Sequence, residues 1–167
     1  KLYDLYEEAC TPYEWHKELF NYADKLGITI FSSPFDNESI DFLSELNVPA
    51  FKIASFEIID LELIKYAASK GKPLLISTGM ASQKEIDDAV KIAKDYGTGE
   101  ILLFHCISSY PAPSKEANIS LIKTLKDKYN VEVGLSDHTL TNISAILAIS
   151  MGAAAVEKHF ILDNNMK

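Results

Sequence analysis

The sequence predicts a parallel α/β fold, and the main observation behind this prediction is an alternation of two kinds of segment. Six short β-type runs are separated by longer segments of helical periodicity, at intervals typical of consecutive βα units. Most of the β-type runs are continuous apolar stretches, as expected for strands of a parallel sheet that is covered on both faces. Consecutive βα units imply parallel strands, because each crossover returns the chain to the same edge of the sheet.

Two architectures fit this alternation, a doubly wound sheet and a (β/α)8 TIM barrel. A doubly wound nucleotide-binding protein usually has a glycine-rich turn after its first strand, and neither that turn nor a P-loop occurs in this sequence. Six units are two fewer than a closed barrel of eight requires. We therefore expect either an open sheet or an incomplete portion of a barrel.

The first helix is predicted within residues 11–27, before the first β-type run. Thr11 and Glu14 have the spacing of a capping box, Pro12 suits the first turn, and Gly27 is expected to end the helix. Apolar side chains recur at helical steps along it, at Trp15, Leu19, Tyr22 and Leu26. We expect Trp15 and the nearby tyrosines to be packing residues.

The remaining elements follow in regular order. Strands are expected at 28–32, 50–54, 73–77, 101–106, 131–135 and 154–159. The helix after the third strand has the clearest boundaries, because Ser82 and Glu85 form a second capping box and Gly97 ends the periodic segment. Further helices are expected at 36–46, 60–70, 118–129 and 142–151.

Composition narrows the class of protein. The chain has 167 residues, of which 47% are hydrophobic, so a disordered protein is excluded and one packed domain is expected. The net charge is −8, and the sequence has no basic stripe of the kind that nucleic-acid-binding proteins usually carry. No apolar run is long enough for a transmembrane helix, and the opening residues do not resemble a signal peptide. Cys10 and Cys106 are expected to be reduced thiols in a cytoplasmic protein.

Polar residues follow or close every predicted strand. Hydroxyl groups or charged side chains occur there at Ser32, Ser33, Lys52, Ser55, Glu57, Ser77, Thr78, His105, Ser108, Ser109, Tyr110, Ser136, His138, Glu157 and His159. In a parallel α/β fold these ends share one face, which holds the active site in barrels. A ring of hydroxyls with one lysine suits an oxyanion such as phosphate. The alternative is that the serines cap the helices that follow them.

Two of these residues are histidines, His138 and His159, on what should be neighbouring strands. Adjacent strands lie about 4.8 Å apart, so both imidazoles could bind one metal ion. Two histidines without a thiolate suit a divalent ion such as Mn²⁺, which can polarise a carbonyl oxygen. From spacing alone, hydrogen-bonded core histidines are an equal alternative. His16 is expected to be a surface or packing residue, and His105 a core residue that might reach the site.

Carboxylates at the strand ends form a further group of candidates. Glu57 and Glu157 could orient a hydroxylated substrate or act as a general base. The alternative for each is a surface salt bridge. The residues alone do not decide between these roles.

Six motifs give the sequence a resemblance to a known family. The segments SSPFD, FKIASFE, LLISTGMAS, HCISSYPAP, VGLSDHT and VEKHF resemble, in order and spacing, the signatures of the sialic acid synthase family. The resemblance implies condensation of phosphoenolpyruvate with an N-acetylated amino sugar to a nine-carbon 2-keto acid. It also implies a TIM-barrel catalytic domain, followed by a small antifreeze-like domain in a homodimer.

Within the family, two features resemble the pseudaminic acid synthase branch. They are the opening LYDLYEEACTPYEWHKELF and Phe56, where related branches more often carry glycine. This branch implies 2,4-diacetamido-2,4,6-trideoxyhexose as the sugar, with N-acetylneuraminate or legionaminate synthase as the alternative.

The resemblance also implies roles for individual residues. His138 and His159 match the Mn²⁺ ligands, and Glu57 and Tyr110 would face the sugar. Phosphoenolpyruvate would be held by Ser55, Ser77 and Ser136, with Lys52 near its carboxylate or phosphate. Ser33 and Ser108 match substrate-contacting positions where relatives carry threonine or asparagine. As catalytic residues we therefore expect Lys52, Glu57, His138 and His159.

The chain departs from the family pattern at both ends. The first two barrel strands and the antifreeze-like domain have no counterpart, so residues 1–167 are expected to be a partial barrel, about strands three to eight. Such a portion, by itself, is expected to be inactive and to associate. Two other functions stay open, a Schiff-base aldolase that uses Lys52 and a non-catalytic sugar-binding barrel.

Overall fold

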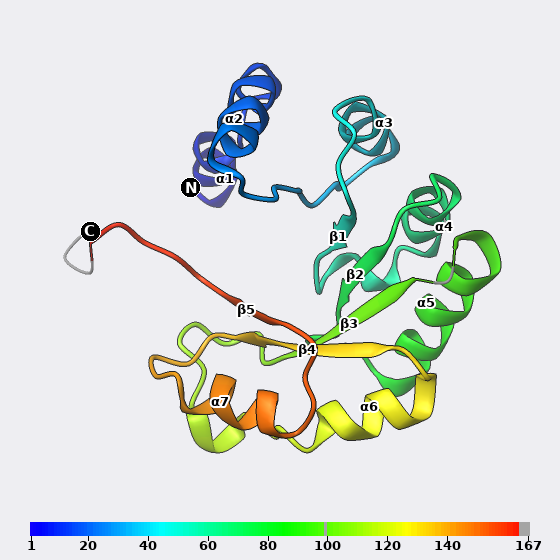
Figure 1. Cartoon of the computed structure of the whole chain (residues 1–167), viewed down its shortest axis with the longest axis vertical. Helices are drawn as coiled ribbons and strands as arrows, with labels where there is room; N and C mark the ends of the chain where they lie inside the picture. Colours follow the sequence, from blue (N-terminus) through cyan, green and yellow to red (C-terminus); the bar gives the residue numbers. More distant parts are fainter. Residues whose placement is uncertain (99, 164–167) are drawn as a thin grey trace.

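The computed structural model describes residues 1–98 and 100–163, and its centre is one parallel sheet (Figure 1). The strands are β1 (Phe51–Ile53), β2 (Leu74–Ser77), β3 (Ile101–Cys106), β4 (Glu132–Asp137) and β5 (Val156–Lys158). They are ordered β1-β2-β3-β4-β5, so each strand pairs with its neighbour in sequence. All four pairings are parallel. This is the topology of part of a βα barrel, and it confirms the predicted fold class.

Helices connect successive strands, as the periodicity predicted. They are α1 (Leu2–Ala9), α2 (Tyr13–Leu26), α3 (Asn37–Glu45), α4 (Leu61–Ser69), α5 (Gln83–Tyr96), α6 (Leu121–Tyr129) and α7 (Ile143–Ser150), with short 3-10 helices η1 (Glu57–Ile59) and η2 (Ser114–Glu116). Helix α1 has no counterpart among the predicted elements. In Figure 1 the sheet is curved, and helices α3 to α7 follow its outer side. No helix among the described residues combines the length and apolarity that a membrane span needs.

The prediction of a strand at 28–32 is wrong. These residues have no strand conformation, and the backbone N–H of Lys52 donates to the carbonyl of Ser32 as a single contact to β1, at 3.3 Å. Ile28 and Phe31 are exposed. An apolar run becomes a strand only when a neighbouring strand forms a regular series of backbone hydrogen bonds with it. Residues 28–32 make a single such bond to β1. Strand β1 is therefore an edge of the described sheet.

The two predicted capping boxes have different outcomes. In α5 the box is present: the Ser82 hydroxyl accepts from the Glu85 N–H, and the Glu85 carboxylate accepts from the Ser82 N–H. In α2 the box is absent, because Pro12 occupies the cap position and no side chain caps the helix. Gly27 ends α2 as predicted, in the left-handed conformation with φ 68°.

The apolar core fills the space between the sheet and helices α3 to α6. Phe51 and Ile53 of β1, Ile76 of β2 and Leu103 of β3 are fully buried within it. Successive strand residues face opposite sides, so Lys52, between two core residues, faces away from these helices. Trp15, Leu19, Tyr22 and Leu26 are all exposed, which contradicts the packing role expected for Trp15. The reason is orientation: α2 turns Ala23, not this stripe, inward.

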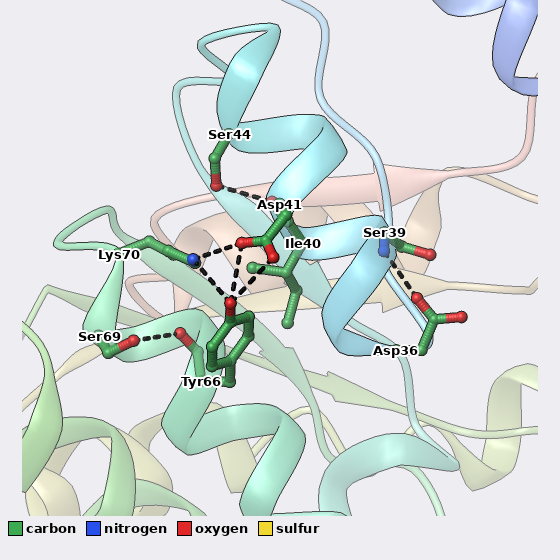
Figure 2. A network of polar contacts seen from close by, with 8 residues as sticks. All are labelled: Asp36, Ser39, Ile40, Asp41, Ser44, Tyr66, Ser69 and Lys70. Carbon is green, nitrogen blue, oxygen red and sulfur yellow. Dashed lines mark hydrogen bonds and ion pairs between the residues drawn. The ribbon is translucent and has the colours of Figure 1, made fainter.

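A polar network on the outer surface ties α3 to α4. Asp41 accepts hydrogen bonds from the Tyr66 hydroxyl at 2.9 Å and from the Lys70 ammonium at 2.5 Å (Figure 2). Asp36 caps α3 by accepting from the Ser39 N–H at 2.6 Å. The contacts of Asp41 thus join α3 to α4 at a distance from the polar strand ends.

Candidate functional site

The carboxyl ends of β1, β2, β4 and β5 bring four polar side chains into one connected group. Lys52 is 9% exposed, and its ammonium donates to the Ser77 hydroxyl at 2.7 Å. The same ammonium lies 3.6 Å from one carboxylate oxygen of Glu157. The Ser136 hydroxyl donates to the other carboxylate oxygen of Glu157 at 2.7 Å. A buried cation and two hydroxyls thus converge at one edge of the sheet, where an anionic ligand would be held.

Glu157 is more than a surface salt bridge, one of the two roles that the sequence left open for it. It accepts from Ser136 and pairs with Lys52, so it joins β4 and β5 to β1. Because its two oxygens have different partners, its orientation is determined on both sides. Ser136, which bonds Glu157, also lies 3.4 Å from Nε2 of His138, so the carboxylate is connected through it to the histidine pair. A carboxylate held in this way can orient a substrate or transfer a proton.

The two histidines lie side by side just beyond β4 and β5. The ring centroids of His138 and His159 are 5.3 Å apart. Tyr110 contacts both, with its ring centroid 4.3 Å from that of His138 and 5.5 Å from that of His159. The pair predicted from spacing is therefore brought together, and the aromatic ring covers it on one side.

One contact determines which nitrogen of His138 is available to a ligand. Its Nδ1 lies 2.9 Å from the carbonyl oxygen of Ile107. A carbonyl only accepts, so Nδ1 must carry the hydrogen and Nε2 keeps a lone pair. This arrangement, with the second nitrogen donating to a carbonyl, is the usual one for metal-binding histidines.

The donors present fit a divalent metal that takes few protein ligands. Among the described residues, no group of three or more His, Cys, Asp or Glu side chains could hold a metal ion. His138 and His159 would supply two nitrogen ligands, and water or substrate oxygens would complete the shell. A closed structural zinc site needs four protein ligands, so it does not fit here.

A second group lies where the loops after β1, β2 and β3 meet. The Ser55 hydroxyl is 3.3 Å from the Cys106 thiol. A Cβ at Gly79 would lie 2.4 Å from the Ser108 hydroxyl and 2.8 Å from that of Ser55. A side chain at position 79 would therefore require these hydroxyls to move. Neither Gly79 nor Cys106 was among the predicted site residues. The signal in the sequence was a glycine directly after the polar end of a strand, Ser77-Thr78.

The positions of two further candidates, His105 and Glu57, are also defined. His105 is a core residue, since it is 6% exposed and its Nε2–H donates to the carbonyl of Ala117 at 2.8 Å. Burial lowers the pKa of His105, so the neutral ring is favoured. Glu57 begins η1 and has one buried carboxylate oxygen without a hydrogen-bond partner among the described residues. That unsatisfied oxygen is costly unless a ligand or water bonds to it.

Ser33 is not brought to this group. It lines a separate hollow between the 28–35 segment and α2, with His16, Tyr13 and Phe42. His16 stacks there on Phe20, meets Phe42 edge-to-face, and is a half-buried packing residue, as expected.

Charges on the opposite face of β4 are also paired. Asp137 is buried and accepts from Lys158 at 2.7 Å and from the Thr139 N–H at 2.9 Å. Burial by itself would raise the pKa of Asp137, but the hydrogen bonds from Lys158 and Thr139 together hold it below its usual value. Asp137 is therefore ionised at neutral pH, directly beside His138 in the chain.

Comparison with known proteins places this geometry in context. The model of the NeuB family matches residues 1–167. Pseudaminic acid synthase of Helicobacter pylori is 45% identical over 166 residues, which are 99% of this chain and 49% of that protein. N,N'-diacetyllegionaminic acid synthase of Campylobacter jejuni is 43% identical over 153 residues, 90% of this chain and 46% of that protein. The chain thus spans about half the length of these relatives.

A solved structure shows the same fold. The N-acetylneuraminic acid synthetase of Leptospira borgpetersenii, in complex with citrate, superposes with a TM-score of 0.90 at 37% identity. The match covers 94% of this chain and 55% of that one.

Proposed function

Because this chain belongs to the NeuB family, we propose that it forms part of the catalytic barrel of a synthase that condenses phosphoenolpyruvate with an N-acetylated amino sugar. The product would be a nine-carbon, sialic-acid-like 2-keto acid, with release of phosphate. The observation that carries the proposal is the position of the Lys52, Ser77, Glu157 and Ser136 group beside the histidine pair. The residues that would bind the phosphoenolpyruvate anion and the histidines that would bind a carbonyl-polarising metal thus lie at one edge of the sheet.

The sugar is proposed to be 2,4-diacetamido-2,4,6-trideoxyhexose. The similarity to a protein named pseudaminic acid synthase, at 45% identity over 99% of the chain, supports this choice. Phe56, between Ser55 and Glu57, is 69% exposed and would therefore be free to contact a sugar. The nearly equal identity to a legionaminic acid synthase makes its sugar the competing substrate.

His138 and His159 are proposed to hold a divalent ion, Mn²⁺ in the first place. When bound, such an ion supplies Lewis-acid polarisation of a carbonyl oxygen. The chain's own contribution is the lone pair on His138 Nε2, which the Ile107 carbonyl keeps available. Tyr110, which contacts both rings, would flank the bound ion on one side.

The remaining residues would bind and orient the two substrates. Lys52, Ser77 and Ser136, with Ser55, would hold the phosphate and carboxylate of phosphoenolpyruvate, and Glu57 and Tyr110 would face the sugar. Ser108, packed against Gly79, would complete this binding edge. The methylene carbon of phosphoenolpyruvate then forms the new C–C bond to the sugar aldehyde carbon, whose oxygen takes up a proton.

Release of phosphate completes the reaction. Water adds to C2, where positive charge develops, and the C2–O bond to phosphate breaks as the keto group forms. Glu157, which is held by Ser136 and lies 3.6 Å from Lys52, would accept the proton of that water. One phosphoenolpyruvate, one sugar and one water thus give one 2-keto acid and one phosphate.

The chain is proposed to act within a longer protein, a cytoplasmic homodimer. It spans about half of its curated relatives, and β1 and β5 leave the described sheet open at both edges. Residues that the relatives carry elsewhere would complete the site. For the 167 residues alone we expect little or no turnover.

The test measures phosphate release from phosphoenolpyruvate by the full-length protein that carries this chain. Each candidate sugar is supplied with and without Mn²⁺, and 2,4-diacetamido-2,4,6-trideoxyhexose is expected to give the highest rate. His138→Ala and His159→Ala are expected to reduce kcat/KM about a thousandfold, because several kcal/mol of Lewis-acid stabilisation correspond to about three powers of ten. His16→Ala is the matched control and should keep the parent rate.

Two outcomes would contradict the proposal. Phosphate release that is independent of both histidines and of Mn²⁺ would remove the metal role. A covalent adduct on Lys52 after borohydride treatment with a carbonyl substrate would support a Schiff-base aldolase in place of the synthase.

A further inference from the structure

The last residue pairs between β4 and β5 directly precede the two histidines in the chain. In this ladder Ser136 pairs with Glu157, and Asp137 pairs with Lys158. His138 and His159 are the next residues in each strand direction. Since successive side chains point to opposite faces, the Ser136–Glu157 bond and the histidine pair share the site face, and the Asp137–Lys158 pair lies on the other face.

Lys158 makes three polar contacts there, and all of them reach the segment that carries His138. Its ammonium donates to the Asp137 carboxylate at 2.7 Å, to the Thr139 carbonyl at 2.8 Å and to the Thr141 carbonyl at 3.2 Å. The other oxygen of Asp137 accepts from the Thr139 N–H at 2.9 Å. The Asp137 side chain is 1% exposed and that of Lys158 is 34% exposed, so this is a partly buried, charge-assisted contact. One lysine of β5 thus holds the 137–141 segment on both sides of His138.

Backbone pairing by itself holds this junction weakly. Strand β5 has three residues, pairs with β4 at three positions and is an edge strand of the described sheet. Side-chain contacts across the junction therefore carry much of the restraint on the distance between the two strand ends. His159 follows Lys158 directly, so any movement of Lys158 relative to Asp137 changes the separation of the imidazoles.

We propose that Lys158 is a positioning residue: clamped to Asp137 and to the carbonyls of Thr139 and Thr141, it keeps His138 and His159 at the separation that one divalent ion requires. This inference rests on the metal-binding role proposed above for the two histidines.

Electrostatics and positioning predict opposite signs for the loss of Lys158. Removing a positive charge next to a cation site should strengthen Mn²⁺ binding if charge alone matters. Losing the clamp should weaken binding, since partners outside the ligand shell typically contribute about 10- to 100-fold to metal affinity. The direction of the change therefore separates the two explanations.

The experiment measures the dissociation constant of Mn²⁺ for the full-length protein, from the electron paramagnetic resonance signal of free Mn²⁺. Lys158→Met is expected to weaken binding at least about tenfold. Lys158→Arg, which keeps the charge and the donors, is expected to restore most of the affinity. Lys126→Met is the matched control, because Lys126 bonds Glu132 at the other end of β4, also at 2.7 Å, and should leave the affinity unchanged.

Lys158→Met leaves the buried Asp137 without its ion-pair partner, so this variant could lose affinity because it misfolds. A second variant controls for that effect. The double variant Asp137→Asn/Lys158→Met buries no unpaired charge and keeps an acceptor for the Thr139 N–H. It is expected to fold, as judged by its thermal unfolding midpoint, and still to bind Mn²⁺ about tenfold more weakly.

Parent-like or tighter Mn²⁺ binding by folded Lys158→Met or by the double variant would overturn the role of Lys158 and leave the histidine site intact. A lower unfolding midpoint with unchanged affinity would also overturn it, because the lysine would then serve the fold alone. Absence of Mn²⁺ binding by the parent protein would overturn both this inference and the proposed metal site.

Discussion

At the scale of single residues, environment gives the same side chain different chemistry. His105 and His138 both donate a ring hydrogen to a backbone carbonyl, of Ala117 and of Ile107 respectively. His105 does so in the core, where burial lowers its pKa. His138 does so at the strand edge, next to a second imidazole, with its Nε2 3.4 Å from the Ser136 hydroxyl. One ring contributes to the fold, and the other is available to a ligand.

The pKa of His105 predicts how the stability of the fold depends on pH. Its folded-state pKa lies below the unfolded value of 6.5, so the unfolded chain takes up a proton first as the pH falls. The free energy of unfolding should therefore decrease below about pH 6.5, by at most about 1.4 kcal/mol per pH unit from this residue. Urea unfolding from pH 7.5 to 5 measures this slope.

The matched variant for that measurement is His105→Gln, whose amide can still donate to the Ala117 carbonyl but does not titrate. Its pH slope should be shallower than that of the parent. Equal slopes for the two proteins would show that His105 does not stay neutral in the folded state.

At the scale of elements, the helix boundaries depend on local contacts that can be tested separately. Helix α5 begins with a complete capping box, whereas α2 begins at Pro12 without one. The same sequence pattern, a hydroxyl residue with a glutamate three positions later, occurs at the start of both helices. The difference arises because Pro12 takes the cap position in α2, which leaves Thr11 one residue outside the helix.

Ser82→Ala should lower the free energy of unfolding by about 1 kcal/mol, because it leaves the Glu85 N–H without its capping acceptor. Thr11→Ala is the matched control and should be close to neutral. Chemical denaturation of both variants measures the difference. A neutral result for Ser82→Ala, or an equal loss for both, would contradict the capping assignment.

At the scale of the whole molecule, the described sheet has two open edges and several apolar side chains in solvent. On α7 these are Ile143, Ile146, Leu147 and Ile149, and beyond β5 they are Phe160 and Leu162. Exposed apolar surface and unpaired strand edges both favour association. The polar strand ends, by contrast, already contact one another within the chain.

The 167-residue chain by itself should therefore associate as its concentration rises. Sedimentation velocity over a wide concentration range measures this, and Ile146→Lys should reduce it, because a charge then replaces a side chain that is 66% exposed. Asn21→Lys, at an exposed neutral position of α2, makes the same +1 change and controls for net charge. A single monomeric species at every concentration would contradict the prediction.

The sequence by itself determined most of the helices, the order of the strands and the family. These features depend on local periodicity, on short motifs such as VGLSDHT and VEKHF, and on the chain order of βα units, all of which can be read without knowing the partners. It also indicated His138 and His159 as a pair, because parallel strands end at a common edge.

Only the tertiary structure decided which side chains meet and which apolar run becomes a strand. Residues 28–32 have the composition of a strand but make one backbone hydrogen bond to β1 and no ladder, and Ser33 lines the hollow beside α2. The contacts of Glu157 with Lys52, and of Lys158 with Asp137, depend on the register between strands. These contacts join residues 105 and 21 positions apart in the sequence, so no local pattern specifies them.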